Sequence, residues 1–121
     1  MIIVYVDILL VIHYILLIFM LCYVNAFSSI DIAFMPIAPC EPRAWMNHAH
    51  LDAQQAGQAL LDLKAQYFVP ILWNTFRFGL AFFDFPIKNL LIWWHHTNTL
   101  VTDKDLHILK VGKRHIIPLF S

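Results

Sequence analysis

The sequence predicts an all-α membrane protein, and three observations lead to this prediction. Sixty per cent of the 121 residues are hydrophobic and 13 per cent are charged, whereas a typical soluble domain is about 45–50 per cent apolar and about 25 per cent charged. The first 24 residues are almost continuously apolar. The apolar residues beyond them exceed what so short a chain can bury in a core of its own.

Composition also excludes several other classes of protein. Aromatic residues make up 15 per cent of the chain, which argues against disorder. Basic and acidic residues number 8 each, so no net positive charge favours nucleic acid. Two cysteines are too few for a disulfide framework.

Residues 1–24 predict a transmembrane helix, because about twenty apolar residues are enough to cross a bilayer core of ~30 Å. Asp7 and His13 are the only strongly polar members of this run. A cleavable signal peptide is the alternative, but no basic segment precedes the apolar run, and the run is longer than is usual for such a peptide. We therefore expect a retained span.

The middle of the chain predicts a connector followed by a helix. Residues 25–42 contain Pro36, Pro39 and Pro42, which prevent a regular helix and predict a proline-rich surface linker. Residues 43–67 predict an amphipathic helix, because one set of residues recurs at spacings of three and four. Small side chains in this set allow close approach, so we expect a partner helix to contact Trp45, Ala49, Ala53, Ala56, Leu60 and Leu63.

Residues 68–96 predict an aromatic segment at the level of the membrane. Arg77, Asp84 and Lys88 interrupt it, and charged groups make a lone span unfavourable. Two interpretations stay open: a second span shielded by partner helices, or an interfacial helix, which we favour. Pro86 predicts the start of a helix that runs to about His96.

Residues 97–121 predict a polar, basic tail. Lys110, Lys113 and Arg114 form a small cluster that suits anionic lipid headgroups, such as those of cardiolipin.

The sequence predicts no catalytic residue, no metal site and no enzyme activity. His48, His50 and Asp52 alternate along a predicted helix, where positions i and i+2 point away from each other. His13 is the sharper candidate, since a histidine inside a span can bind haem or line a quinone site. We nevertheless expect no cofactor beyond bound phospholipid.

The expected function is that of a non-catalytic accessory or structural subunit of a large membrane protein complex. The expected location is the mitochondrial inner membrane, in a respiratory-chain complex, with other subunits and membrane lipids as partners. Neither nucleic acid nor a small-molecule substrate is expected. One alternative is a redox anchor that holds haem or quinone through His13. Another is a membrane subunit of an ATP synthase or a transport complex.

Overall fold

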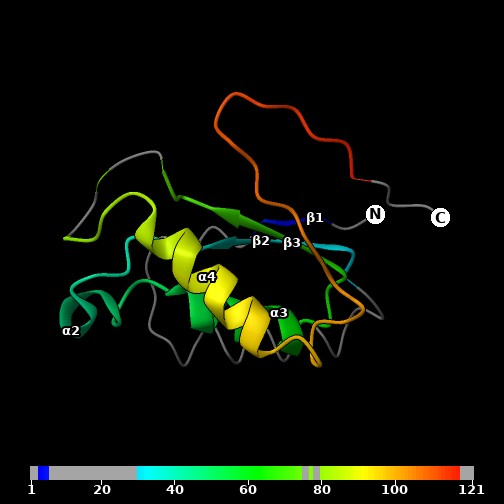
Figure 1. Ribbon diagram of the computed structural model, residues 1–121, viewed down its shortest axis with the longest axis horizontal. Helices are drawn as coiled ribbons and strands as arrows, with labels where there is room; N and C mark the ends of the chain where they lie inside the picture. Colours follow the sequence, from blue (N-terminus) through cyan, green and yellow to red (C-terminus); the bar gives the residue numbers. More distant parts are fainter. Residues whose placement is uncertain (1–2, 6–29, 75–76, 78–79, 118–121) are drawn as a thin grey trace.

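The protein is a small α/β structure built on a parallel sheet (Figure 1). The computed structural model describes residues 3–5, 30–74, 77 and 80–117. The elements follow the order β1 (Ile3–Tyr5), β2 (Ile32–Pro36), α2 (Arg43–Met46), α3 (Ala53–Asp62), β3 (Tyr67–Ile71), α4 (Phe85–His96) and β4 (Asp105–Leu106). The strand order is β1-β2-β3-β4, and every neighbouring pair is parallel.

The two central strands pair over their full length. Ile32 lies opposite Tyr67, and the register runs through to Pro36 opposite Ile71. Parallel neighbours need a crossover connection, and α3 provides it between β2 and β3, while α4 lies between β3 and β4. Figure 1 shows both helices on one side of the sheet and the tail, coloured orange to red, on the other side.

Alternating side chains give the sheet two apolar faces, as the strand period of two requires. On one face, Ala33, Met35 and Phe68 join α3 and α4 in the larger core. On the other face, Ile32, Tyr67 and Val69 are buried, with Leu109 and Ile117 of the tail packed against them. The tail therefore covers part of the sheet face opposite α3 and α4.

Helix α3 begins with a capping box. The Asp52 carboxylate accepts the backbone N–H of Gln55 at 2.8 Å, and the Gln55 side chain accepts the backbone N–H of Asp52 at 3.2 Å. The two bonds satisfy two donors that a helix start otherwise leaves open. This cap fixes the start of α3 at Ala53, ten residues after position 43, where the sequence predicted that the helix would begin.

Helix α4 confirms the expectation that Pro86 starts a helix ending near His96. Lys88 and Asp84 form an exposed ion pair one turn apart at its start, and hydrogen bonding to Lys88 lowers the pKa of Asp84. Trp93 of α4 packs over α3 at Gly57, where the absence of a side chain leaves room for the indole ring. Leu90 is fully buried below it.

The all-α membrane fold that the sequence predicted is wrong. Ile3–Tyr5, predicted as part of a transmembrane helix over 1–24, form strand β1, and residues 6–24 lie outside the described residues. Among the described residues, no helix has the length and apolarity needed to cross a bilayer. This finding contradicts the predicted transmembrane helix, the integral location in the mitochondrial inner membrane and the respiratory-chain role derived from them.

The remaining segments are also corrected. The predicted linker over 25–42 contains the central strand β2, and the predicted helix over 43–67 is two helices, α2 and α3, followed by a turn. The predicted interfacial segment over 68–96 comprises most of β3, a connection and α4, which packs on α3. The physical reason is that strands buried on both faces are apolar throughout and resemble lipid-facing sequence.

Candidate functional site: the carboxyl end of the sheet and the groove beside it

The carboxyl ends of β2 and β3 bring two loops together. In open parallel sheets, ligands bind outside this edge of the sheet. The chain after β2 leads into α2, and the chain after β3 leads into α4. The backbone N–H of Leu80 donates to the carbonyl oxygen of Glu41 at 3.1 Å, so the two loops are joined directly.

The turn after β3 has an unusual backbone. Leu72 has φ 61° and Asn74 has φ 55°. Asn tolerates the left-handed region, whereas a branched side chain such as Leu seldom adopts it. Between them, the indole N–H of Trp73 donates to the carbonyl oxygen of Pro70 at 3.0 Å. This turn directs Leu72 outward, where 56 per cent of it is exposed.

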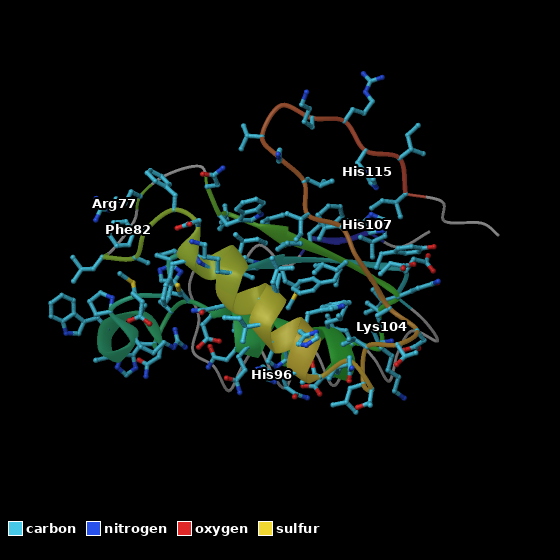
Figure 2. All side chains as sticks on the ribbon, viewed as in Figure 1. Arg77, Phe82, His96, Lys104, His107 and His115 are labelled. Carbon is cyan, nitrogen blue, oxygen red and sulfur yellow. The ribbon has the colours of Figure 1, made fainter. Side chains whose placement is uncertain are left out.

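Large apolar side chains are exposed around these loops. We call the following set the carboxyl-end surface: Trp45, Leu72, Leu80, Phe82 and Phe83. Trp45 is 75 per cent exposed and Phe82 is 72 per cent exposed. The guanidinium of Arg77 lies over the Phe82 ring, 5.6 Å from its centroid, and Figure 2 shows the two side chains together at one end of the molecule.

A groove of about 420 Å³ lies beside this surface, between the start of α3 and one side of α4. Its lining on the α3 side includes Glu41, Asp52 and Gln54. Its lining on the α4 side recurs at helical spacing and comprises Phe85, Asn89, Ile92, Trp93, His96 and Thr97. The groove therefore combines carboxylates, amides and aromatic rings.

Arg43 organises the charges behind the groove. Its Nε lies 3.1 Å from an oxygen of Asp52, and its two terminal nitrogens donate to Gln55 Oε1 at 2.6 Å and to the His50 carbonyl oxygen at 3.2 Å. Its backbone N–H donates to the Glu41 carboxylate at 2.9 Å. The guanidinium is thus engaged within the chain, whereas its neighbour Glu41 faces the groove.

Cys40 lies between the groove and the loops but is not built as a nucleophile. The residue is 2 per cent exposed. Burial raises the pKa of its thiol, and the carboxylates of Glu41 and Asp52 raise it further, against a lowering by Arg43. A protonated thiol is a poor nucleophile, so at neutral pH the Cys40 side chain serves as an apolar core residue and not as a nucleophile.

The predicted partner-helix residues separate in the structure. Ala53, Ala56, Leu60 and Leu63 are buried in the core of the chain itself. Ala49 lies between α2 and α3 and is half-buried, and Trp45 alone of the six is exposed. Contact with a partner helix is not tested by these positions, but Trp45 is the one available to it.

The other predicted residues are scattered. His13 lies outside the described residues. Lys110, Lys113 and Arg114 are exposed on the tail, and their predicted contact with lipid headgroups stays untested. Within the described ranges, no three His, Cys, Asp or Glu side chains are grouped so as to hold a metal ion.

One contact between titratable side chains was not predicted from the sequence. His107 Nδ1 and His115 Nε2 lie 2.9 Å apart and share a hydrogen bond, and the His107 ring packs against Tyr67 with centroids 5.6 Å apart. Figure 2 shows the pair at the base of the tail. It joins the two ends of the tail loop, which brings Leu109 and Ile117 onto the sheet.

Sequence reasoning missed both the carboxyl-end surface and the groove. An available signal was the alternation of short apolar runs with helical stretches, which is typical of a parallel sheet. No model of a known protein family matches this chain.

Proposed function

We propose that this chain is a non-catalytic subunit that binds a partner protein through the carboxyl-end surface. The observation that supports the proposal is the exposure of five large apolar side chains on the segments that follow β2 and β3, which the hydrogen bond from Leu80 to Glu41 joins: Trp45, Leu72, Leu80, Phe82 and Phe83. Exposed apolar patches of this kind mark interaction sites. Full burial of one such side chain contributes about 1.5–3 kcal/mol, so several together can support a specific complex.

The composition of the surface indicates the chemistry of the partner. Aromatic residues and arginine are enriched in protein interfaces and at their energetic centres. Arg77 is exposed and forms no ion pair with a carboxylate in the part of the chain that the structure describes. The partner is therefore a protein segment that carries apolar side chains and an acidic residue to meet Arg77.

The non-catalytic part of the proposal is supported by the state of Cys40. This thiol lines the groove beside the joined loops, yet burial raises its pKa and keeps it protonated at neutral pH. The haem or quinone alternative through His13 stays an untested prediction, because that residue lies outside the described residues.

Site-specific photo-crosslinking of the full chain tests the docking surface. A benzophenone side chain is placed at position 82 in one variant and at position 62 in a control. Position 62 is chosen because Asp62 is exposed at the end of α3, outside the carboxyl-end surface. We expect one protein to be crosslinked in cells from position 82 and not from position 62. Equal crosslinking from both positions, or none from position 82, would overturn the proposal.

Binding constants then establish whether the surface supplies the affinity. With the crosslinked protein purified, Phe82→Ser should raise the Kd about 30-fold, which corresponds to about 2 kcal/mol for an aromatic residue at the centre of an interface. Asp62→Ala should leave the Kd unchanged. An unchanged Kd for Phe82→Ser contradicts the proposal. It is also contradicted if sedimentation shows that the chain forms a dimer and that Phe82→Ser prevents the dimer.

A further inference from the structure

The groove between α3 and α4 has the properties of a ligand site that is separate from the carboxyl-end surface. Its volume of about 420 Å³ lies in the range of about 300–1,000 Å³ that small-molecule sites occupy. It extends along α4 from Phe85 to Thr97, and Figure 2 labels His96 near the far end of this helix. Such a groove holds a compact molecule rather than a folded partner.

The charges of the groove favour a cation. Glu41 and Asp52 line it, and its lining contains no lysine or arginine. Arg43 lies behind the groove, and its guanidinium is already bound to Asp52, Gln55 and the carbonyl oxygen of His50. Arg43 balances one of the two carboxylates, so one negative charge is left to attract a positive ligand.

The walls of the groove are apolar and aromatic. Phe85, Ile92 and Trp93 line the groove from α4, and hydrophobic and aromatic side chains of this kind form most of the lining of small-molecule sites. Asn89 and His96 also line the groove, and their side chains make no hydrogen bond within the described part of the chain. A few polar groups that converge on an apolar pocket fix the orientation of a ligand.

We propose that this groove binds a small organic cation, namely a protonated primary amine with a compact aromatic or apolar body. The ammonium group is bound by the Glu41 carboxylate, and the apolar body lies against Trp93 and Ile92. One oxygen of Glu41 already accepts the backbone N–H of Arg43, which orients the carboxylate before a ligand arrives. The proposal is independent of the docking surface, because the groove lining excludes Phe82 and Arg77.

Three probes of matched shape test the charge preference. These are 2-phenylethylammonium, 2-phenylethanol and 3-phenylpropanoate, which carry a positive, a neutral and a negative group on the same ring and two-carbon chain. Titration is followed by the indole N–H signals of ¹⁵N-labelled full-length protein. We expect the amine to bind with a Kd of about 1 mM, the range for so small a ligand, and to shift the Trp93 signal but not that of Trp45.

The neutral alcohol should bind about tenfold more weakly than the amine, because it lacks the charge-assisted contact. The acid should not compete with the amine. The proposal is overturned if the amine and the alcohol bind equally, if no probe binds at tenfold higher concentration than the expected Kd, or if the amine shifts the signals of other tryptophans and not that of Trp93.

Substitutions locate the cation. Glu41→Gln keeps an oxygen for the Arg43 N–H, and we expect it to weaken amine binding about tenfold while leaving alcohol binding unchanged. Asn89→Asp adds a charge to the opposite wall and should tighten amine binding. Asp62→Asn removes a carboxylate outside the groove and is the matched control. Equal effects of Glu41→Gln and Asp62→Asn on amine binding would contradict the proposed site. Amine binding should be unchanged in Phe82→Ser, so failure of the cation site can be distinguished from failure of partner docking.

Discussion

Gly57 allows α3 and α4 to pack closely, and its replacement by alanine tests this packing. A β-carbon at position 57 would lie 2.4, 2.5 and 2.6 Å from three ring atoms of Trp93. Carbon atoms in contact lie about 3.5–4.0 Å apart, so the ring or the helix has to move by more than about 1 Å. Trp93 meets the edge of Trp94, which stacks on the buried Phe68, so the movement is transmitted into the core.

The expected cost follows from two opposing effects. Alanine is better than glycine inside a helix by about 1 kcal/mol. Overpacking a core costs about 1–3 kcal/mol, and three overlapping ring atoms place Gly57→Ala at the upper end of that range. We expect the free energy of unfolding to fall by about 2 kcal/mol and Tm to fall by roughly 10 °C, measured by urea and thermal denaturation.

A second background separates the clash from helix propensity. Trp93→Leu removes the ring, so Gly57→Ala in that background should raise the free energy of unfolding by up to about 1 kcal/mol. The reasoning is refuted if Gly57→Ala stabilises the otherwise unchanged chain, or if its effect is the same in both backgrounds. Either result would mean that contact with the Trp93 ring does not determine the cost of a β-carbon at position 57.

Two further predictions concern the elements around the groove. Asp52→Ala removes the α3 cap and the ion pair with Arg43, and should lower the free energy of unfolding by about 1–2 kcal/mol. Asp52→Asn keeps the cap and should lower it by less than about 1 kcal/mol. Equal losses for the two variants in urea denaturation would argue against the cap. Burial and nearby carboxylates raise the pKa of Cys40. In a Cys22→Ser chain, iodoacetamide should therefore alkylate Cys40 more slowly than free cysteine, and the rate should rise at a higher pH than it does for free cysteine. Equal rates at neutral pH, measured by mass spectrometry, would contradict this.

Some local features of the fold could be predicted from the sequence. The spacing of Ala53, Ala56 and Leu60 indicated one helical face, and these residues form the buried face of α3. Pro86 indicated the start of a helix, and α4 includes it in its first turn. Periodicity and proline can identify a helix because both signals lie within a few turns of the helix itself.

The sheet could not be predicted in the same way, because its strands lack the alternation that reveals a half-buried strand. β2 and β3 are buried on both faces, so their sequences are apolar without interruption. Pro36 and Pro70 further argue against central strands. In the structure each lies near the end of its strand, where Pro36 pairs with Ile71 and Pro70 pairs with Met35.

The candidate sites depend on contacts between residues that are distant in the sequence. Glu41 and Asn89 line one groove, although 47 residues separate them, and neither position has a local signature. The left-handed backbone of Leu72 is not a preference of leucine. The turn that leaves the sheet imposes this backbone conformation, so the exposure of the Leu72 side chain could be found only from the folded chain.

The most direct test of the proposed docking function is a charge exchange across the interface. Arg77 is exposed and lies over Phe82 of the carboxyl-end surface, and the partner is proposed to meet Arg77 with an acidic residue. Arg77→Glu should weaken binding of the purified partner about tenfold. Lysine in place of the partner's acidic residue nearest to the site crosslinked from position 82 should restore most of the lost affinity. Restored affinity is the result that we predict. A Kd that is unchanged by Arg77→Glu, or that no lysine substitution restores, would contradict the proposal that this end of the sheet binds the partner.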